Sequence, residues 1–210
     1  YTSNSAAQLL AMIAINKPEA IVIDLTCGSG TLLVEAYHVK DELYKKAHPE
    51  MPPEKRHNEI LKSLYGNDIS VFAAHLASIN LARQNLAVSA DIINITIGDG
   101  LSIRPSDKIA PFKSSHEGDL WIEFPYAHCI LMNPPFSRQV NMSKETLNHI
   151  NSKMKEYGVL DYVDGRMGLN AYFVLHTDQF LKEDGIMALV ISSATFTTNY
   201  ATKLLEFLME

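Results

Sequence analysis

Residues 20–33, AIVIDLTCGSGTLL, carry the pattern that decides the fold. Their first six residues are mainly apolar and rich in β-branched side chains, as in a strand that is buried on both faces of a sheet. A turn with Gly28 and Gly30 follows, and residues 31–46 then resume the apolar spacing of a helix. A strand, a glycine turn and a helix in this order predict one unit of a parallel α/β sheet.

The rest of the chain repeats this alternation. Ser70 is a predicted N-cap, and the helix after it places Phe72, Ala73, Leu76 and Ile79 on one face. Further strands are predicted at residues 63–67, 91–99, 128–133 and 186–193. Further helices are predicted at residues 4–16 and 168–185. The pattern predicts one α/β domain with a doubly wound, mostly parallel sheet and helices on both faces.

Two segments have more specific expectations. Gly185 is the predicted C-terminal cap of the helix over 168–185. Residues 46–60, KAHPEMPPEKRHNEI, are charged and contain prolines, so we interpret them as a surface insertion. The chain also stops at LLEFLME, within an amphipathic pattern, which suggests a fragment of a longer protein.

Composition excludes several functional classes. The chain has 210 residues, 47% of them hydrophobic, which suits one globular domain. No run approaches the length of a membrane helix and no secretory signal is evident, so we expect a cytoplasmic protein. Cys27 and Cys129 lack partners in sequence, and we expect two free buried thiols and no metal site. The net charge of -6 argues mildly against a dedicated nucleic-acid surface on this segment.

Acidic residues follow the second and third predicted strands, as the glycine turn follows the first. Asp68 and Asp99 therefore share one edge of the sheet with Gly28 and Gly30. An acid after the second strand can hold a ribose diol, and one after the third can reach an adenine amino group. The alternatives are a turn that only reverses the chain, an Asp68 that only caps a helix, and an Asp99 that only shapes an Asp-Gly turn. Together, these residues favour nucleoside binding.

Two other nucleotide sites are disfavoured. The dinucleotide fingerprint requires a third glycine where the chain has Leu33, and an acid much closer than Asp68. A P-loop requires Gly-Lys-Ser or Gly-Lys-Thr, which does not follow the turn.

The tetrapeptide NPPF follows the fourth predicted strand. The Asn133 side-chain oxygen and the Pro134 carbonyl can each accept a hydrogen bond from the same amino group, and Phe136 can stack on a flat substrate. Two such acceptors bend a conjugated amine towards tetrahedral geometry, so that it can attack a methyl donor. A rigid Pro-Pro loop is the alternative interpretation.

The motifs DLTCGSG, GNDIS, GDG and NPPF, in this order, resemble those of the S-adenosylmethionine-dependent adenine-N6 DNA methyltransferases of restriction-modification systems. The leading YTS and the wording NPPFSRQ are similar to the DNA branch. The resemblance implies that Asp68 holds the ribose and Asp99 the adenine of S-adenosylmethionine. The implied cofactor-binding residues are Tyr1, Thr2, Asp24, Thr26, Gly28, Gly30, Asp68, Ile69, Asp99, Gly100 and Asn133. The implied catalytic residues are Asn133, Pro134, Pro135 and Phe136, and they would hold an adenine flipped out of duplex DNA.

The chain departs from the family pattern in several ways. Leu25 and Thr26 stand where proline and alanine are common. Two further strands and a target-recognition domain are missing, so a specificity or restriction subunit, or a fused domain, is an expected partner. RNA, a protein glutamine amide, and cofactor binding without catalysis stay open as alternatives. A cytosine-C5 mechanism is disfavoured, because Cys129 precedes the tetrapeptide inside a strand.

Overall fold

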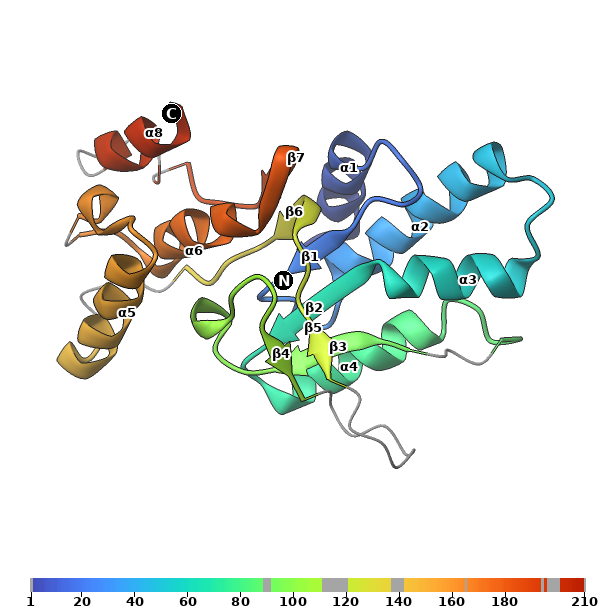
Figure 1. Cartoon of the computed structure of the whole chain (residues 1–210), viewed down its shortest axis with the longest axis horizontal. Coiled ribbons are helices and arrows are strands. Elements are labelled where there is room, and N and C mark those ends of the chain that lie inside the picture. Colours follow the sequence, from blue (N-terminus) through green and yellow to red (C-terminus); the bar gives the residue numbers. More distant parts are fainter. Residues whose placement is uncertain are drawn as a thin grey trace. The chain divides into compact units, whose positions relative to one another are not determined.

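The computed structural model describes residues 2–88, 92–110, 121–136, 142–164, 166–193, 195 and 201–209. The chain forms two compact units, whose elements are labelled in Figure 1. The first comprises Tyr1–Met132 and Phe180–Leu189, and the second comprises Asn133–Gln179 and Val190–Glu210.

Among the described residues, the first unit is built on a five-stranded sheet whose strand pairs are all parallel (Figure 1). The strand order is β3-β2-β1-β6-β7. Strand order reverses between β1 and β6, and in open α/β sheets ligands bind beside the carboxyl ends of the strands at such a point. The expected doubly wound, mostly parallel fold class is confirmed. The strands are β1 (Val22–Asp24), β2 (Leu64–Asp68), β3 (Asn94–Ile97), β6 (Ala127–Met132) and β7 (Leu181–Leu189).

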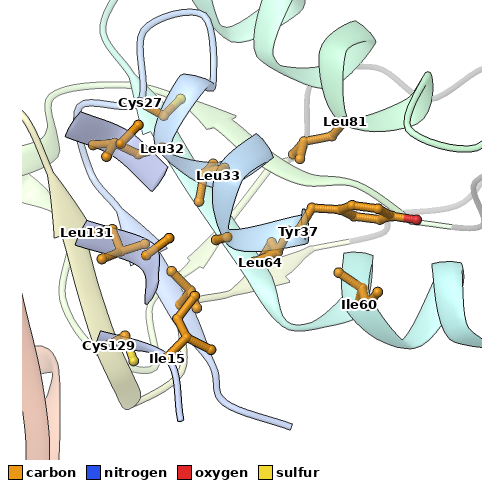
Figure 2. Packing of buried hydrophobic residues seen from close by; sticks show 14 of the residues in the cluster. Ile15, Cys27, Leu32, Leu33, Tyr37, Ile60, Leu64, Leu81, Cys129 and Leu131 are labelled. Carbon is orange, nitrogen blue, oxygen red and sulfur yellow. The ribbon is translucent and has the colours of Figure 1, made fainter. Parts of the chain in front are cut away.

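Four helices pack on one face of this sheet. Val22 pairs with Leu64 on one side and Cys129 on the other, so the three side chains share a face. Each is at most 2% exposed, and burying an aliphatic side chain of this size stabilises a fold by about 1.5–3 kcal/mol. Figure 2 shows Leu33 and Tyr37 joining this cluster. The helices are α1 (Asn4–Ala14), α2 (Thr31–Ala47), α3 (Pro53–Lys62) and α4 (Val71–Ala82).

Aromatic side chains cover the opposite face. Tyr65 alternates with Leu64 and so points away from the helices. The Phe124 ring lies 5.9 Å from the Tyr65 ring and 6.5 Å from the Phe180 ring, measured between centroids. Phe124 follows a small antiparallel pair that the sequence analysis did not anticipate. The elements of this region are η1 (Gly100–Ser102), β4 (Lys108–Ile109) and β5 (Ile122–Glu123).

The second unit is helical within its described residues. The Ser143 hydroxyl accepts a hydrogen bond from Thr146 N at 3.1 Å and caps the first of its helices. Lys203 donates to the backbone carbonyls of Asp161 and Val163 at 2.9 and 3.1 Å, which joins the last helix to a short 3-10 turn. No helix in the described ranges is long and apolar enough to cross a membrane. The elements are α5 (Lys144–Glu156), η3 (Leu160–Tyr162), α6 (Leu169–Thr177) and α8 (Ala201–Met209).

The α4 helix begins as predicted but turns a different face to the core. Ser70 is its N-cap. The predicted face is wrong, because Phe72 is 76% exposed and Ile79 is 59% exposed. A Cβ built on Gly30 would lie 3.1 Å from Ala77, so only small side chains fit between α4 and the glycine turn. The buried residues of α4 are Ala74, Ala77 and Leu81.

The interpretation of residues 46–60 as a surface insertion is wrong for their second half, where α3 packs on α2. His57 is 1% exposed, and its Nδ1 lies 2.7 Å from the Tyr37 hydroxyl. Arg56 Nε donates to Asp41 Oδ1 at 2.6 Å. Because these polar groups find partners on α2, a sequence rich in charge can still be buried.

The predicted helix over 168–185 is also too long, and Gly185 is not its cap. The helix α6 ends at Thr177, a 3-10 turn η4 (Asp178–Phe180) follows, and Gly185 lies within β7. Phe180 is fully buried against Phe124, and Leu181 already pairs with β6. Tertiary packing therefore converts the last turns of a helical pattern into a strand.

Candidate functional site

The glycine turn leads from β1 into α2 and depends on two left-handed residues. Gly28 has φ +53° and Gly30 has φ +82°, a region where a side chain is strained. Gly30 N donates to Cys27 O at 2.8 Å and closes the turn. A Cβ on Gly28 would meet no described atom within 4 Å, whereas one on Gly30 would press on Ala77. The backbone at Gly28 therefore borders open space, and that at Gly30 borders α4.

Asp68 ties this turn to the end of β2. Its Oδ2 accepts a hydrogen bond from Gly28 N at 2.8 Å, and its Oδ1 accepts one from Ser70 N at 2.9 Å. The cap of α4 is Ser70 rather than Asp68, so the alternative role of Asp68 as a helix cap is not the one seen. Each carboxylate oxygen can accept a second bond. Asp68 is thus anchored to the glycine turn and still has the chemistry to bind a diol.

Asp24 ends β1 and is 1% exposed. Its Oδ1 accepts hydrogen bonds from Thr26 N at 3.0 Å and from the Thr26 hydroxyl at 3.5 Å. Burial, followed by the nearby charge of Asp68, raises the pKa of Asp24 to about 7, although the Thr26 bonds oppose this. Burial and the same two acids also raise the pKa of the Cys27 thiol. Cys27 is therefore a protonated, buried thiol, as expected.

Asp99 ends the connection that follows β3. Its Oδ1 accepts from Leu101 N at 3.1 Å and its Oδ2 from the Ser102 hydroxyl at 2.7 Å, so it caps η1. The turn-shaping role is therefore present, and contact with an adenine stays a prediction. Gly100 is buried as the first residue of η1. Ile69, next to Asp68, is 76% exposed at the same edge of the sheet.

The NPPF tetrapeptide begins directly after β6, whose last residue is Met132. Asn133, Pro134, Pro135 and Phe136 belong to the second unit, while the glycine turn and the acids belong to the first. Phe136 is 51% exposed, which suits a ring that stacks on a planar group.

The leading motif lies at the start of α1. Thr2 is half-buried, and it precedes Ser3, whose hydroxyl caps this helix. Tyr1 lies outside the described residues. The roles of both in cofactor binding stay predictions.

Asn67 also lies at this edge, and it was not predicted as a site residue from the sequence. It is completely buried, and its amide bonds the ends of both neighbouring strands. The available signal was an amide in an otherwise apolar strand, directly before an acid. A polar side chain at such a position requires partners on both sides.

A family comparison identifies the chain's relatives. The model for the N-6 DNA methylases matches residues 1–210. The chain belongs to the N-6 DNA methylase family. The family's reaction is methylation at N6 of adenine, with S-adenosylmethionine as the methyl donor.

Solved structures of restriction-modification proteins share the fold. The type IIG restriction endonuclease BpuSI matches with a TM-score of 0.70 and 18% identity, over 99% of this chain and 22% of its own. The M protein of the type I enzyme EcoKI matches at 0.63 and 17%, over 100% and 38%. The type ISP enzyme LlaBIII bound to DNA matches at 0.71 and 12%, over 100% and 16%.

This N-6 DNA methylase chain thus spans less than half the length of each of these three proteins. A search of proteins with curated function found no match.

Proposed function

We propose that the protein transfers a methyl group from S-adenosylmethionine to the N6 amino group of adenine in DNA. The proposal rests on the order of the glycine turn, Asp68 and the NPPF tetrapeptide along a chain that belongs to the N-6 DNA methylase family. A glycine turn hydrogen-bonded to Asp68 is followed along the chain by Asn133, Pro134 and Phe136, directly after β6.

The first unit offers the groups that the cofactor requires. S-adenosylmethionine supplies a methyl group on a positively charged sulfur, from which an amine can take it. Asp68 carries carboxylate lone pairs suited to the ribose diol, and the open space at Gly28 admits a ligand close to the backbone. Residues present at this edge therefore fit the cofactor.

The tetrapeptide supplies the groups for the substrate amine. Asn133 Oδ1 and the Pro134 carbonyl would each accept a hydrogen bond from one N–H of the N6 amino group, and Phe136 would stack on the adenine ring. These hydrogen bonds would localise the lone pair on nitrogen, so that it could displace the methyl group that S-adenosylmethionine would supply, with the electrons of the carbon–sulfur bond staying on sulfur. The methylated nitrogen would then be positively charged and would lose one proton to solvent. Reaching these groups requires the adenine to leave its duplex.

The partners follow from the same proposal. DNA is the substrate, and a specificity subunit, a restriction subunit or a fused domain would read its sequence. The matched proteins include a restriction endonuclease and an enzyme bound to DNA, which supports this assignment. We place the protein in the cytoplasm, where such systems meet DNA.

Two substitutions in the intact protein test the separate roles proposed for Asn133 in methyl transfer and for Asp68 in cofactor binding. We expect Asn133→Ala to lower methyl transfer to duplex DNA by roughly a hundredfold or more, because the amine loses an acceptor, at an affinity for S-adenosylhomocysteine within about threefold of the wild type. We expect Asp68→Ala to act on cofactor binding instead, and to weaken S-adenosylhomocysteine binding by at least about tenfold. Label transfer and calorimetry give the two readouts.

The exposed Asn148 of α5 provides the control, and Asn148→Ala should change neither readout. Unchanged methylation in Asn133→Ala would contradict the proposed role of the tetrapeptide. Methyl transfer to RNA or to a protein glutamine in preference to duplex DNA would reassign the substrate. Tight cofactor binding without methyl transfer to DNA, RNA or protein would indicate a subunit that binds the cofactor without catalysis.

A further inference from the structure

Asn67 lies at the end of the middle strand of three and bonds both of its neighbours. β2 stands between β1 and β3. Asn67 is completely buried, and its Nδ2 donates to Leu25 O at 3.2 Å, just beyond β1, and to Gly98 O at 3.0 Å, just beyond β3. An amide nitrogen has two protons. Each of them is used on the carbonyl where a neighbouring strand ends.

The orientation of this amide is set by Thr96. The Thr96 hydroxyl donates to Asn67 Oδ1 at 3.0 Å, the shorter of its two contacts, the other being with Gly66 O at 3.4 Å, and Thr96 is itself completely buried. Because the oxygen of the amide faces a donor, its nitrogen faces the two carbonyls. Both protons of Asn67 Nδ2 are therefore used in hydrogen bonds to the ends of the neighbouring strands.

The backbone around Asn67 strengthens the same connection. Cys27 N, in the glycine turn, donates to Asn67 O at 2.9 Å. Gly98 N, before Asp99, donates to Asp68 O at 3.1 Å. The residues flanking the glycine turn and those flanking Asp99 are therefore held by one dipeptide in β2.

We propose that Asn67 is a positioning residue for the cofactor, which sets the spacing of the three strand ends that carry the glycine turn, Asp68 and Asp99. Asn67 touches no part of the ligand in this role. The inference rests on the proposed function, because the ligand is taken to be S-adenosylmethionine. Loss of the Asn67 amide removes one hydrogen-bond donor from each of two strand-end carbonyls, and the turns that bind the nucleoside then lose their common spacing.

The chain supplies a matched control in Asn94, at the amino end of β3. It is 7% exposed, and its Nδ2 donates to Leu61 O at 3.4 Å and Lys62 O at 3.2 Å. Asn94 is thus a second buried asparagine that bonds two backbone carbonyls in the same sheet, at the opposite end of the strands. Alanine at Asn94 or at Asn67 removes a side-chain amide that donates to two backbone carbonyls, at the amino end of the strands in one case and at the carboxyl end in the other.

The experiment compares Asn67→Ala and Asn94→Ala in the intact protein, with thermal unfolding, calorimetry with S-adenosylhomocysteine and steady-state methylation. Both variants should lose several degrees of melting temperature, because each removes two hydrogen bonds from a buried side chain to backbone carbonyls. Only Asn67→Ala should bind S-adenosylhomocysteine about tenfold more weakly, with a raised KM for S-adenosylmethionine and a kcat within about twofold. Asn94→Ala should keep the wild-type affinity within about twofold.

Equal affinities in the two variants, or a lowered kcat at an unchanged KM, would overturn the inference in favour of a purely structural Asn67. Should Asn67→Ala fail to fold, Thr96→Val removes only the hydroxyl that orients the amide. It should weaken S-adenosylhomocysteine binding by about threefold, and wild-type affinity in that variant would also overturn the inference. Wild-type protein that does not bind S-adenosylhomocysteine would overturn the proposed function instead, and this is seen without any variant.

Discussion

The two ends of the parallel strands are held by opposite kinds of side chain. At the carboxyl ends, Asp68 and Asp99 accept hydrogen bonds from backbone N–H groups. At the amino end of β1, the fully buried Lys40 of α2 donates to the carbonyls of Pro18 and Ala20. The turns that leave the strands present N–H groups near helix starts, whereas the segments that enter them present carbonyls.

This difference separates binding from support. Carboxylates that each accept one or two backbone bonds retain lone pairs for a ligand, and Gly28 borders open space beside them. The Lys40 ammonium group is buried and donates its hydrogen bonds to backbone carbonyls of the chain. We therefore expect changes at the carboxyl ends to alter cofactor affinity and stability together, and changes at the amino ends to alter stability alone.

The largest expected effect concerns Asp24 and pH. The pKa of Asp24 in the folded chain, about 7, lies above the ordinary value of 3.8, mainly through burial. The folded state therefore binds a proton more readily than the unfolded state, and the stability contributed by this group is full below about pH 4 and is lost as pH rises through 7. Asp24→Asn removes this penalty, so its free energy of unfolding should exceed that of the wild type by about 4 kcal/mol at pH 8 and by little at pH 4.

Denaturant unfolding at a series of pH values gives this comparison, with calorimetry for S-adenosylhomocysteine at pH 8. The amide should weaken ligand binding, since a neutral group cannot attract the ligand's ammonium. A variant no more stable than the wild type at pH 8 would show that Asp24 is ionised there without cost.

The opposite slope is expected from Lys40. Burial lowers its pKa from 10.5 to about 7, so the unfolded state binds a proton more readily, and the stability from this group rises between pH 7 and 10.5. Relative to Lys40→Met, the wild type should gain roughly 3.5 kcal/mol between pH 7 and 10. Unfolding at each pH measures this gain.

Affinity for S-adenosylhomocysteine in folded Lys40→Met should equal that of the wild type, since Lys40 lies at the amino end. A clear loss of affinity at any one pH would break the separation of the two ends. Parallel stability curves for the two proteins would contradict the buried charge.

Elements bounded by local signals could be predicted, and elements decided by distant contacts could not. The buried run before Gly28 and the acid at Asp68 follow directly from sequence order, because parallel strands bring their carboxyl ends together. The face of α4 could not be predicted, because the small size of Ala77 matters only through its approach to Gly30. The amide of Asn67 is polar in a buried strand, and its bonding partners come from two other strands.

The smallest expected effect distinguishes two glycines within the carboxyl ends. Gly28→Ala and Gly30→Ala both force a side chain into the left-handed region, at about 1 kcal/mol each. Gly30→Ala also presses its methyl group against Ala77, so it should be the less stable variant by about 1 kcal/mol more. Gly28→Ala instead projects its methyl group into open space at the edge where the nucleoside is expected. Gly28→Ala should therefore be the more stable of the two variants and the weaker binder of S-adenosylhomocysteine. If Gly28→Ala were instead both the more stable variant in unfolding and the tighter binder in calorimetry, a ligand at Gly28 would be refuted.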